Sequence, residues 1–156
     1  MNLNTAASIV MPGSREEVFD FACANETFER NLRPHGLIAG VEKAEMFEGQ
    51  ALAADSWRRI SLTDGVVIEE LILDYDRPTK HRYRWTGGLK APNSWLVRSG
   101  EGCWDFSEVS GGTRIDWSYV FELTSPLAYP LALVARASYK SWMNHGLEAM
   151  RANFVG

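Results

Sequence analysis

The alternation of apolar and polar residues divides the chain into three parts. Residues 5–11 alternate weakly and end at Pro12-Gly13, which is typical of a first strand followed by a turn. From residue 37 to residue 123 the apolar residues follow a period of two, as in strands with one buried face. From residue 126 to about residue 154 they follow the period of a helix. The pattern predicts a strand, a meander of strands and a long C-terminal helix.

Two short helices are predicted between the first strand and the meander. Ser14 is a candidate N-cap with Glu17 three residues later, an arrangement in which each side chain satisfies a free backbone donor at the other end. Asn25 is a candidate N-cap for a second helix that runs through Phe28. Pro34-His35-Gly36 would end that second helix, because the residue before a proline is disfavoured in the helical conformation.

The meander is interrupted at five turn sites, which predict about six strands. These sites are Glu48-Gly49, Asp64-Gly65, Arg77-Pro78, Gly87-Gly88 and Gly111-Gly112. Asp64-Gly65 is the clearest hairpin signal, because a type I′ turn needs a positive φ at both central residues and Asp-Gly tolerates it. Gly111-Gly112 predicts a second tight hairpin by the same reasoning. Residues 88–94 are expected to form a mobile loop.

The C-terminal helix is predicted to start at Ser125-Pro126, an N-cap followed by a proline whose missing N–H costs nothing there. Pro130 is expected to bend or delay the helix. At 100° per residue, one face carries Leu131, Ala135, Ser138, Tyr139, Trp142, Met143, Gly146, Ala149 and Met150, and the opposite face carries Arg136, Lys140, Asn144 and Arg151. The helix is therefore amphipathic and is expected to pack on the sheet.

The order of elements predicts a single α+β domain over residues 1–156, without an internal repeat or linker. The composition is that of a globular chain, with 46% apolar and 23% charged residues. The formal net charge of -4 argues against nucleic acid as a general partner, because no broad basic field is present.

Cysteine usage and hydropathy favour a cytoplasmic protein. Cys23 and Cys103 fit neither a metal motif nor a disulfide framework, so we expect buried free thiols. Residues 1–8 do not have the form of a secretory signal. The longest apolar stretch, residues 126–135, is interrupted by Pro130 and is too short to span a bilayer. We expect no membrane span, no metal and no cofactor.

Three segments give the chain a resemblance that covers nearly all of its length. They are residues 11–19 (Met-Pro-Gly-Ser-Arg-Glu-Glu-Val-Phe), residues 74–78 (Asp-Tyr-Asp-Arg-Pro) and residues 112–117 (Gly-Thr-Arg-Ile-Asp-Trp). With this order of elements, the chain resembles the START-like helix-grip (SRPBCC) superfamily, and more closely its polyketide cyclase/dehydrase-type members. The resemblance implies a curved antiparallel sheet wrapped around the C-terminal helix. It also implies a cavity for a hydrophobic or aromatic ligand.

Aromatic residues recur at alternating positions of the predicted strands, so each set faces one side of the sheet. Core filling against the helix and the lining of a ligand cavity are both open readings, because large aromatic rings serve both. A cavity for a planar ligand favours rings with a polar edge. We therefore expect the ligand-binding residues to be Tyr83, Trp85, Trp104, Tyr119 and Trp142.

Glu69 and Glu70 interrupt an apolar run at residues 66–75, so one of the two carboxylates must point toward the interior. Glu70 is the preferred candidate, with Ile68 and Ile72 as its neighbours on the same face. A buried carboxylate has a raised pKa unless it is paired, which suits a general acid or base. The alternatives are that the carboxylate lies near an open end of the sheet, or that it forms a structural ion pair across strands with Arg58, Arg59, Arg82 or Arg84.

The histidines offer weaker catalytic candidates. His35 lies in a predicted loop that could border the cavity mouth, and His145 lies near the edge of the helix face that meets the sheet. Neither has an acidic neighbour at the spacing of a catalytic triad or a metal site, so a structural role is the simpler reading of each.

Three functions are compatible with these patterns. The first is a protein that binds a small hydrophobic or aromatic molecule, with cyclase or dehydratase chemistry that uses Glu70, His35 or His145. The second is a passive carrier of an apolar ligand. The third is an interaction module of the kind that associates with ribosomes or chaperones, which would have a closed core. The chain is expected to be a monomer or a homodimer.

Overall fold

The computed structural model describes residues 1–154 and contains one sheet with four α-helices. The strands are β1 (Asn2–Met11), β2 (Val41–Met46), β3 (Trp57–Leu62), β4 (Val67–Asp76), β5 (Lys80–Thr86), β6 (Val97–Val109) and β7 (Gly112–Leu123). The helices are α1 (Arg15–Ala22), α2 (Asn25–Asn31), α3 (Asn93–Leu96), the 3₁₀ turn η1 (Pro126–Ala128) and α4 (Tyr129–Asn153). The predicted strand, helix pair, six-strand meander and long helix are all confirmed.

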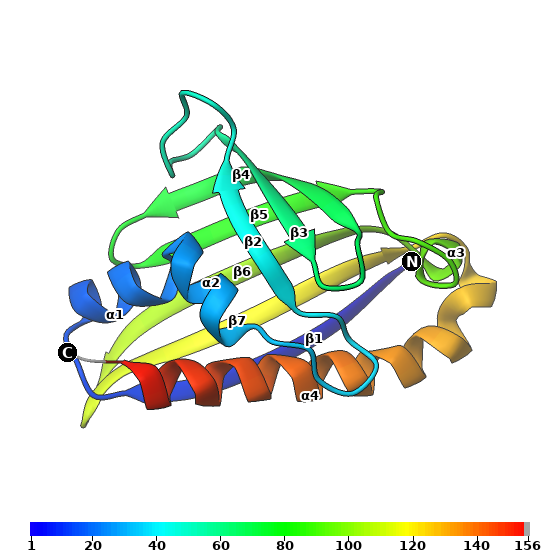
Figure 1. The fold of residues 1–156 in the computed structure, drawn as a ribbon. Coiled ribbons are helices and arrows are strands. Elements are labelled where there is room, and N and C mark those ends of the chain that lie inside the picture. Colours follow the sequence, from blue (N-terminus) through cyan, green and yellow to red (C-terminus); the bar gives the residue numbers. More distant parts are fainter. Residues whose placement is uncertain (155–156) are drawn as a thin grey trace.

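All seven strands form one antiparallel sheet in the order β1-β7-β6-β5-β4-β3-β2. Consecutive strands from β2 to β7 are neighbours, as expected for a meander, and β1 pairs with β7 along its whole length. Figure 1 shows the sheet curving over α4, with α1 and α2 at one end of the helix and α3 at the other. This is the helix-grip arrangement.

Local signals in the sequence account for the helix starts only in part. The Ser14 hydroxyl accepts a hydrogen bond from the Glu17 N–H at 3.2 Å, so the first cap is confirmed. The second prediction is wrong by one residue, because Ala24 occupies the N-cap position of α2. The amide oxygen of Asn25 instead accepts a hydrogen bond from Arg58 Nη1 at 3.2 Å. The Asn25 side chain therefore binds the buried guanidinium of Arg58 and does not cap the backbone of α2.

Both predicted hairpins are present, but not as type I′ turns. Among the described residues outside glycine, only Asp55 has a positive φ, so Asp64 keeps the ordinary conformation. The Gly65 N–H donates to the Leu62 carbonyl at 3.1 Å, and the Leu62 N–H donates to the Val66 carbonyl at 2.8 Å. Only Gly65, at φ +88°, needs the left-handed region. The turn is thus of type I, followed by a glycine bulge.

Helix α4 begins at Tyr129, after η1, so Pro130 lies in its first turn and removes no helical hydrogen bond. The predicted delay is confirmed. The predicted face differs from the buried one at three positions: Leu131 is exposed near the start of the helix, while Ala132 and, farther along, Leu147 are buried. Gly146 allows close packing, since a Cβ there would lie 2.5 Å from Leu32 Cδ2 at the end of α2.

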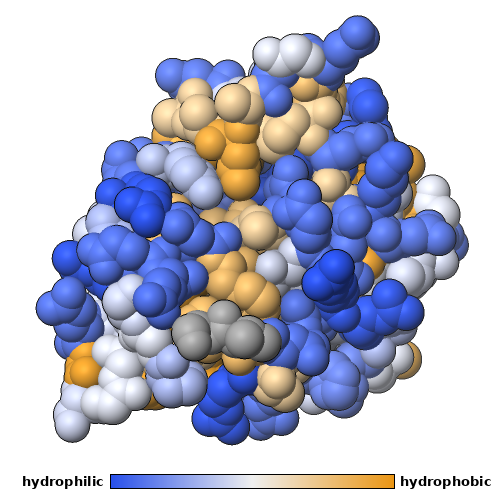
Figure 2. All heavy atoms as spheres, turned by 60° about the vertical axis from the view of Figure 1, so that its left-hand side comes forward, coloured by the Kyte–Doolittle hydropathy of each residue, from blue (hydrophilic) through white to orange (hydrophobic). Residues whose placement is uncertain are grey.

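The end of the molecule that carries α1 and the C-terminus has a mostly hydrophilic surface, as Figure 2 shows. An apolar group gathers in the upper part of this view, toward the loop between β2 and β3 that contains Leu52 and three alanines. Cys23 is a buried free thiol, and Cys103 is free and half-buried. No helix within residues 1–154 is long and apolar enough to cross a membrane.

Candidate functional site

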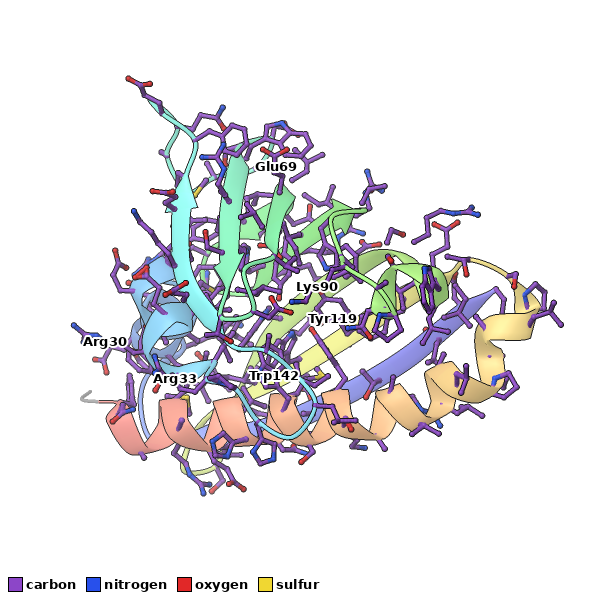
Figure 3. The ribbon with its side chains drawn as sticks, turned by 45° about the vertical axis from the view of Figure 1, so that its right-hand side comes forward. Arg30, Arg33, Glu69, Lys90, Tyr119 and Trp142 are labelled. Carbon is purple, nitrogen blue, oxygen red and sulfur yellow. The ribbon has the colours of Figure 1, made fainter. Side chains whose placement is uncertain are left out.

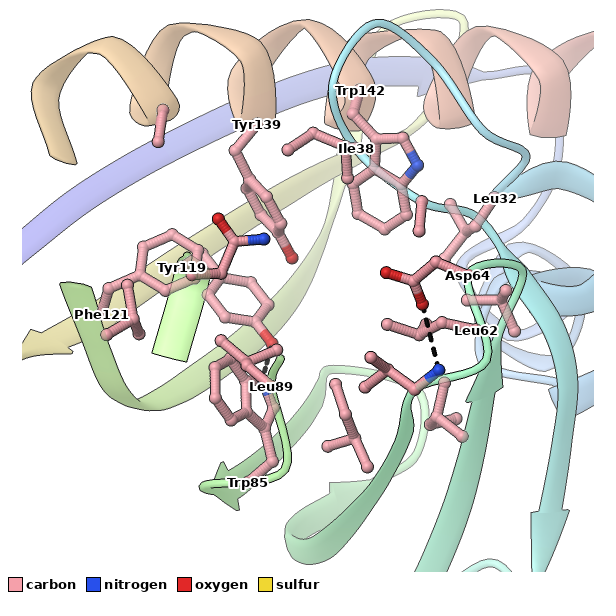
Figure 4. Close-up of a pocket in the computed structure, with 18 of the residues that line it drawn as sticks. Leu32, Ile38, Leu62, Asp64, Trp85, Leu89, Tyr119, Phe121, Tyr139 and Trp142 are labelled. Atoms are coloured by element: carbon pink, nitrogen blue, oxygen red, sulfur yellow. Dashed lines mark hydrogen bonds between the residues drawn. The ribbon is translucent and has the colours of Figure 1, made fainter. Parts of the chain in front are cut away.

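A cavity of about 190 Å³ lies between the inner face of the sheet and α4. Its wall is formed by β3 to β7, by the loop between α2 and β2, by the segment that leads into α3, and by α4. Figure 4 shows the rings of Trp85, Tyr119, Phe121 and Tyr139 on one side of this space and the side chains of Leu32, Ile38 and Leu62 on the other, with the Trp142 ring beside Ile38. A pocket with an apolar wall and a few polar groups is the usual form of a small-molecule site.

Four of the five predicted ligand-binding residues line this cavity: Tyr83, Trp85, Tyr119 and Trp142. All four of these side chains are held by hydrogen bonds rather than by packing alone. Trp85 Nε1 donates to the Tyr119 hydroxyl, and Trp142 Nε1 donates to the Arg33 carbonyl at 2.9 Å. The Tyr83 hydroxyl accepts from Trp104 Nε1 at 3.3 Å. The rings therefore present fixed faces to the cavity.

Trp104 is the exception, because its side chain lies in the core outside the cavity wall. Its ring stacks on Trp117 with centroids 4.4 Å apart and on Phe28 with centroids 5.8 Å apart. The alternation in β6 correctly indicated an inward side chain. It could not indicate depth, which is set by the helix that covers the strand.

Two glycines of β6 make room for the rings of β5. Gly102 pairs with Tyr83, and Gly100 pairs with Trp85. A Cβ at Gly102 would lie 2.5 Å from Tyr83 Cζ, and one at Gly100 would lie 2.5 Å from Trp85 Cζ2. Both rings thus lie flat over the neighbouring strand. This Gly-x-Gly spacing was a usable sequence signal that the pattern of apolar residues alone did not contain.

Glu70 points inward and lines the cavity, whereas Glu69 is exposed. Glu70 Oε1 accepts a hydrogen bond from Arg58 Nε at 2.9 Å and lies 2.8 Å from Arg58 Nη2. The Arg58 guanidinium is fully buried between the rings of Phe28 and Tyr83, each centred 5.0 Å from Cζ. Glu70 is therefore both the inward carboxylate and the acidic partner of a cross-strand ion pair with Arg58.

Burial shifts the pKa values of the acidic groups at the deep end of the cavity upward. Burial raises the pKa of Glu70 above its usual value, and the Arg58 guanidinium opposes this rise. Burial also raises the pKa values of Tyr83, Tyr119 and Tyr139, all of which line the cavity. At neutral pH the three hydroxyls remain donors.

The two histidine candidates lie outside the cavity wall. The rings of His35 and His145 stack with centroids 4.4 Å apart, and His35 Nε2 lies 3.0 Å from Ser141 Oγ. They attach the α2–β2 loop to α4 rather than face the cavity. Sequence reasoning missed His81, which is fully buried beside Tyr75 and Tyr83 and has its pKa lowered to about 3 by burial.

A second group of polar and charged side chains lies where the cavity meets solvent. Asp64, Lys90, Asn93 and Arg136 border this opening, together with the exposed Leu37. Lys90 Nζ donates to the Asp64 carbonyl at 3.0 Å, which joins the β3–β4 hairpin to the segment before α3. Within residues 1–154, no group of three or more His, Cys, Asp and Glu residues could hold a metal ion.

Solved structures with this architecture include two di-domain ARO/CYC proteins from biosynthetic pathways, BexL and StfQ. The di-domain ARO/CYC BexL from the BE-7585A biosynthetic pathway superimposes with a TM-score of 0.71 at 16% identity, over 97% of this chain and 49% of that one. The chain thus spans about half the length of BexL. TTHA0849 from Thermus thermophilus gives 0.69 at 20% identity, over 96% and 95% of the two chains. Ara h 8.0201 gives 0.61 at 13% identity, over 95% and 99%.

At these identities the structural matches show a common fold alone. No curated protein matched the sequence. The sequence itself matches the family described as "Polyketide cyclase / dehydrase and lipid transport" over residues 3–155. Because the match covers almost the whole chain, the protein belongs to the polyketide cyclase / dehydrase and lipid transport family.

Proposed function

We propose that this protein binds a small planar or hydrophobic molecule in the cavity and that Glu70 moves a proton on it. The observation that carries the proposal is a carboxylate at the inner end of an apolar cavity walled by rings. The open cavity favours ligand binding over an interaction module, which would have a closed core.

Proton transfer by Glu70 fits the chemistry of ring closure. Arg58 holds Oε1, and within residues 1–154 no hydrogen bond occupies Oε2, which leaves that oxygen for a ligand. As a carboxylate, Glu70 would take a proton from a carbon between two carbonyl groups. The resulting enolate would attack a second carbonyl carbon to form the new C–C bond.

The tyrosine hydroxyls complete this proposed step. Tyr83, Tyr119 and Tyr139 line the cavity and remain protonated, so they can donate hydrogen bonds to the carbonyl oxygen that gains charge. Glu70 would return its proton to the new alkoxide to give an alcohol. Glu70 would then take the remaining proton of the attacking carbon and pass it to the departing hydroxyl group, so that water leaves, a C=C bond forms and the carboxylate is restored. BexL comes from a biosynthetic pathway and carries the ARO/CYC name, which supports a polyketide-like substrate class.

The binding half of the proposal is tested by closing the cavity. Ala135 lines the cavity on α4, while Ala137 on the same helix is exposed and does not. Ala135→Phe should abolish the quenching of tryptophan fluorescence by 2-naphthol, and Ala137→Phe should retain it. Native mass spectrometry of the purified protein should show a bound small molecule that is absent from Ala135→Phe. Equal quenching in both variants would reject the cavity as the binding site.

A passive carrier is the second candidate, and Glu70→Gln separates it from an enzyme. The amide keeps the size of the side chain and an oxygen for Arg58 but cannot take a proton at neutral pH. If Glu70 acts in catalysis, the variant should still bind the copurified compound and lose at least about 100-fold in its turnover. A carrier would show the same binding and release with either residue.

A further inference from the structure

Five large apolar side chains are exposed around the cavity opening, and we call this set the mouth rim. Its members are Leu37, Trp95, Leu127, Leu131 and Val134, which are between 64% and 90% exposed. They come from the α2–β2 loop, α3, η1 and the first turns of α4. Isolated exposed apolar residues are ordinary, but a group around a cavity opening is typical of an interaction surface.

The mouth rim forms one continuous surface. Leu127, Leu131 and Val134 are spaced by four and three residues, so they form one stripe along η1 and α4. Leu131 lies one turn before Ala135, which lines the cavity. Ser141 lies on the same stripe, seven residues after Val134, and its hydroxyl contacts His35. This contact brings the α2–β2 loop, which carries Leu37, to the side of α4 that carries the stripe.

Trp95 is attached to the other end of the stripe. The Thr124 hydroxyl donates to the Trp95 carbonyl, and Thr124 comes just before η1. Figure 3 shows α3 and the segment of Lys90 next to the first half of α4, with Tyr119 between them in the interior. The rim residues therefore surround the entrance through which a ligand would reach the rings.

Around the mouth rim the basic side chains of Arg33, Lys90 and Arg136 outnumber the acidic side chain that borders the opening, Asp64, although the chain as a whole has a net charge of -4. The three segments that carry the rim, residues 32–41, 77–100 and 124–147, contain no Asp or Glu. Within the described chain, Arg33, Lys90 and Arg136 have no carboxylate within ion-pair distance. A second copy of this chain would bring like charges together, whereas an anionic surface would pair with them.

We propose that the mouth rim docks on the surface of an anionic lipid bilayer. The apolar side chains enter the boundary between headgroups and acyl chains, where tryptophan is also favoured, and the basic side chains meet lipid phosphates. The cavity then opens onto the bilayer, so an apolar ligand enters without crossing water. This docking does not depend on Glu70 and therefore goes beyond the proposed function.

Vesicle co-sedimentation of the intact chain tests the proposal. Vesicles of phosphatidylcholine mixed with phosphatidylglycerol should bind the protein, and phosphatidylcholine alone should bind it at least about ten-fold more weakly. Added salt should lower the binding to the mixed vesicles, because it screens the basic residues. Lys90→Gln with Arg136→Gln should reduce both the affinity and its dependence on salt.

A rim variant and a matched control separate docking from nonspecific adsorption. Leu127→Ser with Leu131→Ser and Val134→Ser should weaken vesicle binding at least about ten-fold, since three apolar side chains no longer enter the bilayer. Val10→Ser with Val109→Ser replaces exposed apolar residues of β1 and β6 and should bind as the parent chain does. Circular dichroism checks that both variants fold.

Three results would overturn the docking proposal. One is equal vesicle binding by the rim variant and the control, and another is no binding to either vesicle. The third is a dimer of the parent chain in light scattering that the rim variant abolishes, since this would assign the surface to a second copy. The three rim residues changed lie outside the cavity wall, so quenching by 2-naphthol should survive in the rim variant. Loss of docking with naphthol binding intact leaves the proposed function standing.

Discussion

At the scale of single residues, the ion pair of Arg58 and Glu70 belongs both to the buried core and to the wall of the cavity. A buried ion pair gains little net stability over an apolar pair of the same size, because both ions lose their hydration. The better explanation of a buried arginine under the cavity is that Arg58 holds the Glu70 carboxylate in place. Arg58 Nη1 also donates to Asn25 Oδ1, and the guanidinium lies between two aromatic rings.

Arg58→Met should cost about 3–5 kcal/mol of unfolding free energy, because it leaves Glu70 buried without a partner. Urea denaturation at pH 7 measures this cost. The control is Arg59→Met on the same strand, whose exposed partner Glu69 lies 3.7 Å away, and it should cost less than about 1 kcal/mol. Arg58→Met combined with Glu70→Leu should recover much of the loss. Equal costs for the two single variants would contradict a structural role for the pair.

His81 makes the fold sensitive to acid. Its pKa lies near 3 in the folded chain and near 6.5 in the unfolded chain, so below pH 6.5 only the unfolded state takes up the proton. Stability from the neutral ring is present above pH 6.5 and is lost progressively down to about pH 3. Between pH 7 and pH 5 the loss should be about 2 kcal/mol. His81→Phe should remove this loss in urea denaturation, while the exposed His145→Gln should keep it.

At the scale of elements, the sequence predicted the order of strands and helices because each depends on local patterns. Every turn site contained glycine or proline, and each one lies between two strands of the sheet. The register and depth of side chains depend on long-range packing, which a period of two does not encode. Trp104 illustrates this limit: it faces inward as expected, but Phe28 and Trp117 cover it.

The site was predictable to the same extent. Alternation placed Tyr83 and Trp85 on one face of their strand and indicated that Glu69 or Glu70 points inward, with Glu70 preferred. Which face of each strand is buried could not be derived from the sequence, and the structure brings all three of Glu70, Tyr83 and Trp85 to the cavity. The residues of the opening could not be predicted, since Lys90 and Arg136 come from segments far apart in the chain. His81 was not singled out as a site residue, because strand alternation places it on the same face as Tyr83 and Trp85 but does not show that its ring is fully buried.

Strand β6 should tolerate side chains poorly at its two glycines. Gly102→Ala should cost about 1–3 kcal/mol, because the new methyl group displaces the Tyr83 ring from the face of the strand. The same variant should weaken quenching by 2-naphthol, since Tyr83 lines the cavity. Ser107→Ala, at an exposed position of β6, should cost less than about 0.5 kcal/mol. Chemical denaturation of both variants compares these costs, and a neutral Gly102→Ala would contradict the close approach.

At the scale of the whole molecule, the cavity divides the fold into a closed end and an open end. Toward α1, the rings of Phe19, Tyr75 and Phe106 fill the space between helix and sheet. Toward α3, loops from three parts of the chain border the opening and are joined by few hydrogen bonds, such as that from Lys90 to the Asp64 carbonyl. A ligand in the cavity would contact the open end and leave the closed end unchanged.

The effect of 2-naphthol on amide hydrogen exchange should therefore differ between the open end and the closed end of the molecule. Residues 36–39 and 88–96 should exchange more slowly with the ligand, because it adds packing contacts to loops that otherwise open locally. Amides of α1 and of the β6–β7 hairpin at the closed end should change far less, since their packing does not involve the cavity. Ala135→Phe controls for binding elsewhere and should show no change in either region. Uniform slowing over the whole chain would instead indicate global stabilisation by linkage, with the loops already ordered before the ligand binds.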